Sequence, residues 1–539
     1  MTTPPPARRE LKRRRTEIES RLKAAGLRRA SLAGVPRWLD PQTQSRIRAL
    51  PAELRSLGPL FCRFGRYLST RLDHISGADC RDLAALPDHA EPFPEAEIRG
   101  RLRSEFGRGG AALRHIEAAP VESLALSQTQ RGWLDDGRLV SLKLARTEVL
   151  SGADLAALPH LAHYLSSLGW PLAAARRVIA DFQDLVARRL DLRDEAEMLG
   201  RLASLRAQPQ YRTPRVVHSL SAAAILTVEV SAGATLFSGP AASPAGAAEA
   251  AGHTRALADL WMHVVFNQRR IPEELQARDL RHATGGALEL TGGLFYAISA
   301  AEVAALWRYV LAAARDDSDA IFEALRDLTE PTSNSRRSAF RHQLGHVVPR
   351  RDGRFGEIPP GFPELLLSHW PQAEKHGFVP GAALRAFYRG LVGLRALCGP
   401  SLSHAVLRES LQVVQISRGS ERLRKALDPS VITRSAESAV QMLTELPRTL
   451  ERISLSRKGR SDLRSDEDDA AEPARDDWAT LTAALLVAAT LVLWFQRSPT
   501  LLAAWTAPVQ ALLLTLLGAA HHTQAGGTRI ARAGRERVW

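Results

Sequence analysis

A single lysine within an apolar strand constrains the fold of this chain most strongly. Residues 138–144 read Arg-Leu-Val-Ser-Leu-Lys-Leu and follow an Asp-Asp-Gly turn at residues 135–137, a pattern typical of a hairpin. Lys143 is therefore expected in a strand, in a chain whose other basic residues are nearly all arginines. Because burying an unpaired ammonium group is costly, the side chain either reaches solvent along the strand or serves a site that needs a positive charge.

The residues around Lys143 favour the second alternative. Kinases carry a phosphate-binding lysine in a strand of the form V-A-I-K. Residues 122–132 and the strand at 140–146 resemble the alanine-rich loop AAASxxQVHxA and the strand VAVKVQRP of the UbiB/AarF/ADCK family of atypical kinases. Gln128, Lys143 and Arg146 match, whereas the alanine run and the histidine do not. The resemblance implies a nucleotide site to which Lys143 and Gln128 contribute.

A second segment strengthens this resemblance. Residues 57–73, LGPLFCRFGRYLSTRLD, are similar to the family sequence LGPTFIKLGQxLSTRPD, with lysine replaced by Arg63 and glutamine by Arg66. In that family the helix covers the nucleotide pocket, so the resemblance places Arg63 beside the cofactor. A planar guanidinium is not equivalent to a point-charge ammonium group. The same spacing also suits an amphipathic helix whose Leu60 and Phe64 pack on a core.

Two further segments supply acidic candidates. Residues 190–196 resemble the family sequence ELDxxxEAxN, and Asp191 and Glu195 match it. In kinases a glutamate on a helix pairs with the strand lysine, so either residue is expected to pair with Lys143; the alternative is an ordinary solvated acidic turn. Residues 211–233 resemble the family's hinge between lobes, in which Glu229 matches.

The catalytic motifs of the family, HxDxHxGN and DFG, are not kept. Residues 271–278 stand where the first motif is expected, and Glu273 falls at its first aspartate. Thr291 stands where the metal-binding aspartate of DFG is expected, and a threonine cannot replace a carboxylate at magnesium. The sequence therefore predicts a pseudokinase, in which ATP binding stays open and the magnesium ligands are lost. Arg278 could occupy the place of the metal as a fixed positive charge.

Four carboxylates near these motifs leave another reading open, in which displaced groups, above all Glu273, support catalysis. They are Glu273, Glu274, Asp279 and Glu289.

Charge and cysteine content limit the partners. The net charge of +14 and the pI of about 10.4 suit anionic lipids or nucleic acid. No zinc finger, basic helix with heptads or aromatic RNA-binding motif is found, so nucleic acid is not expected as a partner. Cys62, Cys80 and Cys398 form no CxxC pair, so neither a disulfide framework nor a metal site is predicted. No signal peptide is expected, because no apolar segment follows the basic N-terminus.

Two apolar runs near the C-terminus predict membrane anchoring. Residues 478–495 and 500–520 are each close to the length that spans hydrocarbon, and a Gln-Arg-Ser-Pro turn joins them. The tail at 521–539 carries several arginines and is expected in the cytoplasm. A hairpin then places the kinase-like domain there too, at the bacterial inner membrane. The alternative is a buried helical hairpin.

Together these patterns predict an α+β, protein-kinase-like two-lobed fold with an N-terminal helical extension and a C-terminal transmembrane helical hairpin. The expected parts are a disordered basic arm (1–30), the helical extension (31–118), the N-lobe (119–235), a helical C-lobe (236–453), a charged linker (454–477), two transmembrane helices (478–520) and a basic tail (521–539).

The resemblance implies support of ubiquinone or other isoprenoid-lipid metabolism. Three hypotheses remain: a membrane-anchored pseudokinase that binds lipids or quinone-biosynthesis proteins, an active atypical kinase or ATPase with displaced metal-binding carboxylates, and a lipid-binding or transport accessory that uses no nucleotide.

Overall fold

The structure is a computed structural model of the 539-residue chain. It describes residues 8–24, 41–72, 75, 77–107, 113–166, 170–203, 211–230, 235–236, 247–282, 287–345, 362–399 and 402–426. The predicted linker, apolar runs and tail, residues 454–539, lie outside the described residues. Among the helices that are described, none is both long and apolar enough to cross a membrane.

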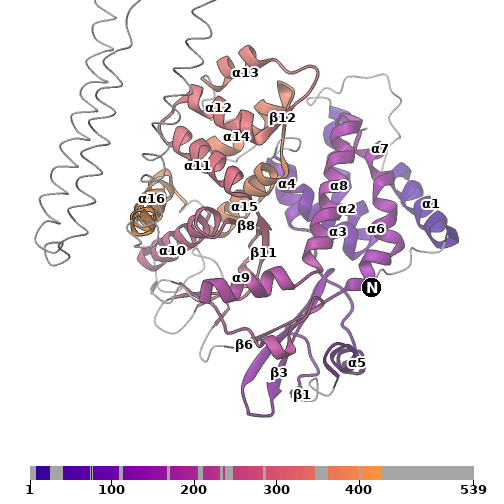
Figure 1. The fold of residues 1–539 in the computed structure, drawn as a ribbon. Coiled ribbons are helices and arrows are strands. Elements are labelled where there is room, and N and C mark those ends of the chain that lie inside the picture. Colours follow the sequence, from indigo (N-terminus) through magenta and orange to yellow (C-terminus); the bar gives the residue numbers. More distant parts are fainter. Residues whose placement is uncertain are drawn as a thin grey trace, which may run out of the picture. The chain divides into compact units, whose positions relative to one another are not determined.

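A helical body precedes and flanks the kinase-like sheet (Figure 1). Its helices are α1 (Arg8–Ala24), α2 (Pro41–Leu57), α3 (Pro59–Leu68), α4 (Gly77–Ala84), α6 (Ala153–Ala157), α7 (Ala162–Leu165) and α8 (Leu172–Arg189). The segment from α6 to α8 follows the lysine strand in sequence, yet it packs against α1 and α3. The structure thus assigns this segment to the helical extension, although the sequence pattern placed it within the N-lobe.

Residues 8–24 form helix α1, although the sequence predicted a disordered arm over residues 1–30. Ile18 and Leu22 are buried on one side of the helix, and Arg14 pairs with Asp154 of α6 at 2.5 Å. An apolar stripe of this kind stabilises a helix by packing rather than by intrinsic propensity. The charged pattern alone hid this stripe, because only three apolar positions, Leu11, Ile18 and Leu22, form it.

The N-lobe is built on an antiparallel sheet in the order β1-β3-β4-β6, with β2 paired to β3. The strands are β1 (Leu113–Ile116), β2 (Glu122–Ser123), β3 (Ser127–Leu134), β4 (Leu139–Ala145) and β6 (Ile225–Glu229), with helices α5 (Glu95–Phe106) and α9 (Arg193–Ala203) beside them. On β4, Val140, Leu142 and Leu144 are fully buried in a cluster that includes Ile98 of α5. Because successive side chains of a strand point to opposite faces, Lys143 faces the other side, toward the C-lobe.

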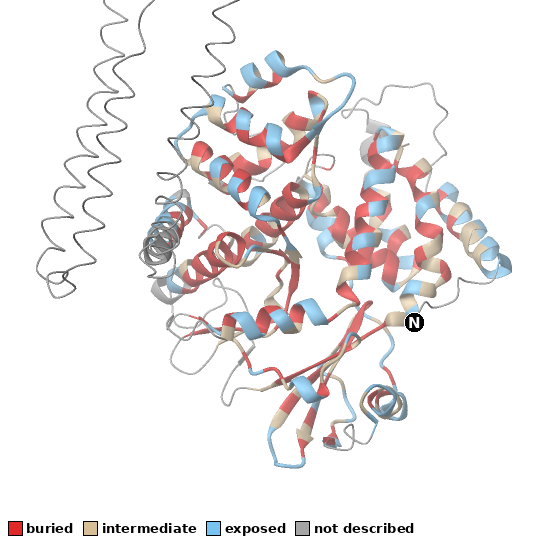
Figure 2. Cartoon of the chain, in the orientation of Figure 1, coloured by how far each residue is buried: buried red, intermediate tan, exposed pale blue. Residues whose placement is uncertain are grey.

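The C-lobe is mainly helical, with short strands beside the cleft. Its helices are α10 (Ala247–Phe266), α11 (Ala300–Ala314), α12 (Ser318–Leu328), α13 (Arg337–Leu344), α14 (Phe362–Lys375), α15 (Ala382–Cys398) and α16 (His404–Ala426). Its strands form three small sheets: β5 (Tyr211–Arg212), β10 (Leu288–Leu290), β9 (Leu280–His282) and β7 (Thr235–Leu236); β8 (Arg270–Glu274) with β11 (Leu294–Ala297); and β12 (Thr329–Pro331) with β13 (Phe378–Pro380). The buried faces of α10, α11 and α15 meet in its core (Figure 2).

Candidate functional site

Lys143 and Glu195 form the central contact of the site. Lys143 Nζ on β4 donates to both carboxylate oxygens of Glu195 on α9, at 2.8 and 3.0 Å. Glu195 Oε1 also accepts the backbone N–H of Gly293 at 2.9 Å, and Arg189 lies 3.9 Å from Oε2. Burial alone would raise the pKa of Glu195, but the nearby Lys143 and Arg189 hold that pKa below its usual value. The predicted pairing of Lys143 with an acidic helix residue is confirmed.

The other candidate partner, Asp191, lies elsewhere. Its carboxylate accepts from the Arg193 guanidinium at 2.5 Å and from the Arg193 backbone N–H at 3.1 Å on an exposed turn. Asp191 precedes the first turn of α9, whereas Glu195 is inside it and on its buried side. Helix phase therefore selects Glu195, and the sequence motif alone did not distinguish the two residues.

Lys143 lines a cavity of about 310 Å³ between the lobes. The sheet contributes the apolar wall, which includes Leu226 and Val228. The C-lobe contributes two short segments, whose lining residues are Ala277, Arg278, Asp279, Arg281, Glu289, Thr291 and Gly292. The volume is near the lower end of the range for small-molecule and cofactor sites. The cavity combines an apolar wall with Lys143, Arg278 and Arg281 as cationic groups, which is an arrangement suited to a base and its phosphates.

Gly292 closes the floor of this cavity. A Cβ atom at this position would lie 2.4 Å from Glu195 Oε1, 3.4 Å from Asp279 Oδ1 and 3.5 Å from Lys143 Nζ. Only glycine lets the backbone approach the ion pair so closely. Position 292 therefore has no room for a carboxylate, and its neighbour Thr291, which lines the cavity, supplies only a hydroxyl.

Asp279 and Glu289 are two carboxylates of the cavity that could serve as metal ligands. Both are buried and line the cavity. Asp279 Oδ2 accepts the backbone N–H of Gln276 at 3.0 Å, which caps the short 3₁₀ turn at Ala277–Asp279, and its Oδ1 faces Arg189 at 4.0 Å. Within the described part of the chain, no three Asp, Glu, His or Cys side chains converge as metal ligands.

Glu273, the candidate for the catalytic aspartate position, does not line the cavity. Its side chain is fully buried on β8, where Arg188 donates to it at 2.5 and 3.2 Å and Arg389 contacts it as well. Burial would raise the pKa of Glu273, but Arg389 and Arg188 outweigh this effect and lower it. The carboxylate is thus held charged by two arginines, which removes it from any role as a proton acceptor at the cleft.

Arg63 reaches the cleft indirectly. Its guanidinium on α3 donates to Asp88 at 3.1 Å and contacts Glu274 on β8. Asp88 is in turn 3.6 Å from Arg278, which lines the cavity. Burial opposes the charged form of Asp88, but Arg63 and Arg278 hold its pKa below the usual value. Helix α3 is therefore tied to the cleft through a chain of alternating charges.

Gln128 and Glu229, which match the family sequence, lie in different places relative to the cavity. Gln128 is fully buried, accepts the backbone N–H of Phe93 at 2.6 Å and donates to Gln130 at 3.1 Å, so it fixes the loop and does not line the cavity. Glu229 lines the cavity at the end of β6, where Arg138 contacts it. No sequence motif marked Asp88 or Arg281, because only the folded chain brings them to the cleft.

Comparisons with known proteins agree with this geometry. Residues 85–277 match the ABC1 atypical kinase-like domain. The probable protein kinase UbiB of Xylella fastidiosa is 32% identical over 195 residues, which are 34% of this chain and 35% of that protein. The probable protein kinase UbiB of Marinobacter nauticus is 28% identical over 241 residues, which are 43% of each chain. The match thus spans about a third to two fifths of these curated relatives.

A solved structure, the complex of Rv3197 with erythromycin from Mycobacterium tuberculosis, aligns with a TM-score of 0.40 at 14% identity, over 66% of this chain and 89% of that one. The domain match covers the sheet, the Lys143–Glu195 pair and the first part of the cleft. The chain therefore has an α+β kinase-like fold and carries an ABC1 atypical kinase-like domain over residues 85–277, with a sequence similar to that of the UbiB proteins.

Proposed function

We propose that this chain is a membrane-anchored pseudokinase whose cleft binds a nucleotide and transfers phosphate very slowly or not at all. One contrast carries the proposal: the cleft keeps the Lys143–Glu195 pair, but Thr291 stands at the metal-binding position and Glu273 is locked between two arginines. Phosphoryl transfer depends mainly on metal ions and positioned charges, so a cleft of this kind favours binding over catalysis.

Different residues of the cleft are proposed to bind different parts of the nucleotide. The apolar wall of Leu226 and Val228 suits a base, whereas Lys143 and Arg278 suit phosphate oxygens. When present with a nucleotide, magnesium neutralises phosphate charge; no step of this proposal depends on it. By resemblance to the family, the biological role is support of ubiquinone or other isoprenoid-lipid metabolism, through bound lipids or proteins of quinone biosynthesis.

A second candidate is an active atypical kinase or ATPase. Asp279 and Glu289 favour it, because both carboxylates line the cavity near Lys143, and magnesium in phosphoryl-transfer sites often has only one or two protein carboxylates. The third reading, a lipid-binding accessory without nucleotide, lacks a comparable observation. The test below separates all three.

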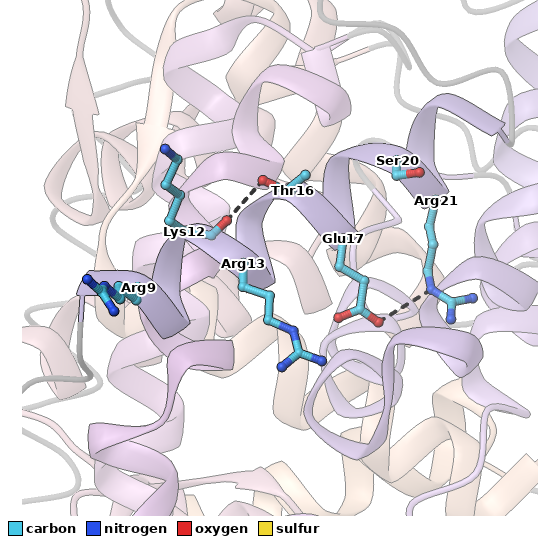
Figure 3. A pocket seen from close by; sticks show the side chains of 7 residues that line it. All are labelled: Arg9, Lys12, Arg13, Thr16, Glu17, Ser20 and Arg21. Carbon is cyan, nitrogen blue, oxygen red and sulfur yellow. Dashed lines mark hydrogen bonds and ion pairs between the residues drawn. The ribbon is translucent and has the colours of Figure 1, made fainter.

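Membrane association is part of the proposal. The apolar runs at 478–495 and 500–520 suit a transmembrane hairpin at the inner membrane, with the kinase-like domain in the cytoplasm. Helix α1 offers a second contact: Arg9, Lys12, Arg13 and Arg21 are exposed around an open hollow of about 740 Å³ (Figure 3). Each basic residue near an anionic lipid surface contributes about 1 kcal/mol.

Ligand-induced stabilisation of the detergent-purified full chain tests the proposal. A ligand that binds only the folded state raises stability in proportion to the logarithm of its concentration. The proposal predicts a higher melting temperature with ATP and loss of this effect in Lys143→Met, together with negligible turnover. Stabilisation with rapid magnesium-dependent turnover would favour the second candidate, and no stabilisation by any nucleotide would favour the accessory.

A further inference from the structure

We propose that the cleft binds nucleotide polyphosphates without a divalent metal, and that the Arg278 guanidinium supplies the charge that a metal ion would otherwise supply. This inference rests on the proposed nucleotide-binding function and adds the form of the ligand to it. Arg278 and Lys143 line the same cavity, one from the C-lobe turn and the other from β4.

The Arg278 guanidinium is only loosely engaged. Its nearest carboxylate oxygens, on Glu122 and Asp88, lie 3.5 and 3.6 Å away. Charge-assisted hydrogen bonds are shorter, about 2.7–2.9 Å. Its side chain is 24% exposed, whereas that of Asp88 is 5% exposed. The donors of Arg278 are therefore available to phosphate oxygens, and a planar fork suits two of these oxygens at once.

The turn that carries Arg278 is fixed from both sides. The Asp279 side chain caps the backbone N–H of Gln276 at 3.0 Å, and the backbone carbonyl of Asp279 accepts the N–H of Thr291 at 2.8 Å. Asp88 is held in turn by Arg63 and by the N–H of Ala125, at 3.1 and 3.2 Å. The backbone that carries Arg278 is therefore held in place before a ligand arrives, and only the guanidinium itself has to turn toward the phosphates.

The carboxylates around the cleft fit a metal poorly. Glu195 is engaged by Lys143 and by the N–H of Gly293. One carboxylate oxygen of Asp279 accepts the backbone N–H of Gln276, and the other faces Arg189. Glu289 is 2% exposed and interacts with groups around it. A magnesium ion would also share the cavity with the guanidinium of Arg278, and like charges at close range repel.

The proposal predicts how nucleotide affinity depends on metal. With full-length protein in detergent at constant ionic strength, the dissociation constant of a fluorescent ATP analogue is measured in EDTA and in excess magnesium. We expect tight binding in EDTA that magnesium improves little. Arg278→Ala should weaken binding in EDTA by roughly tenfold or more, as for one lost charge-assisted contact, and should restore a gain from magnesium.

Two control variants separate the role of the Arg278 fork from the loss of a positive charge. Arg278→Lys retains the charge without the fork and should give an intermediate affinity. Arg177→Ala removes an exposed arginine on α8 and should leave the affinity unchanged. Melting curves of each variant report whether it is folded. Arg278→Lys answers the question if Arg278→Ala does not fold.

The possible results distinguish failure of metal-free binding from failure of nucleotide binding as a whole. Binding by the wild type only with magnesium would overturn this inference and leave the proposed nucleotide-binding function intact. Equal affinity of Arg278→Ala and wild type in EDTA would also overturn it. A lack of binding with or without magnesium would overturn both this inference and the proposed function.

Discussion

Arg63 on α3 contacts Glu274 on β8, which joins the N-terminal helical extension to the strand beside the cleft across 211 positions of sequence. The guanidinium also donates to Asp88, and the side chains of Arg63 and Asp88 are both 5% exposed. This arrangement ties α3 to the strand that lies beside the cleft. Its close approach to α2 and to the loop after α4 requires Gly65, because a Cβ there would meet Leu54 and Leu86 at 2.9 and 2.3 Å.

Removal of Arg63 is predicted to destabilise the whole domain. Arg63→Ala leaves Asp88 and Glu274 without their shared cation in a buried position, and breaking a buried pair costs about 3–5 kcal/mol. Denaturant unfolding should show a loss in this range, whereas Arg177→Ala on the exposed face of α8 should change stability by about 0.5 kcal/mol or less. Equal stability of the two variants would place Arg63 outside any structural ion pair.

Lys143→Met is predicted to lower stability through Glu195. The variant strands a carboxylate that is 4% exposed, and Arg189 at 3.9 Å together with the N–H of Gly293 compensates only in part. A loss of about 3 kcal/mol is expected. Adding Glu195→Gln to Lys143→Met should recover part of it, because the unpaired charge is then gone. Asp191→Asn serves as the control. A loss of stability as large as that of Lys143→Met would contradict the assignment of Glu195 as the partner of Lys143.

Acid should weaken the fold through Asp181. The Tyr67 hydroxyl donates to Asp181 at 2.6 Å and Arg389 and Arg385 flank it. Burial opposes its charged form, but the two arginines and the hydroxyl lower the pKa of Asp181 to about 2. Because the folded-state pKa lies below the unfolded value, the stabilisation is present above about pH 4 and is lost as the pH falls toward 2. It amounts to about 2 kcal/mol.

The control for this acid effect is Asp181→Asn. The unfolding free energy of the variant, measured from pH 5 to pH 2, should fall less steeply than that of the wild type, whatever its absolute stability. Parallel curves would show that other carboxylates carry the acid sensitivity.

Membrane attachment is predicted to have a salt-resistant and a salt-sensitive part. A chain ending at residue 477 lacks the apolar runs and should leave the membrane fraction after a high-salt wash, while still binding anionic vesicles at low salt through α1. Alanines at Arg9, Lys12 and Arg13 should abolish that residual binding. Retention of the shortened chain after the wash would show that the hairpin is not the main anchor.

The sequence predicted the N-lobe better than the C-lobe side of the cleft. The alternation on β4 is local, so it placed Lys143 opposite the buried face, and motif order identified the family. Glu273 could not be excluded from sequence, since its exclusion depends on Arg389 from α15, more than a hundred positions away. The packing of α6 to α8 on the extension was likewise hidden, because a helical period does not reveal which surface a helix covers.

ATP turnover by the detergent-purified full chain, measured with and without magnesium beside Lys143→Met, shows most directly whether this cleft transfers phosphate. The cleft keeps the Lys143–Glu195 pair but has Thr291 where the family resemblance places the metal-binding aspartate. The rate of phosphoryl transfer depends mainly on metal ions and positioned charges. The wild-type chain is therefore predicted to turn over ATP no faster than Lys143→Met, with or without magnesium. A magnesium-dependent rate that Lys143→Met abolishes would contradict the pseudokinase assignment and would make Asp279 and Glu289 the residues to mutate next.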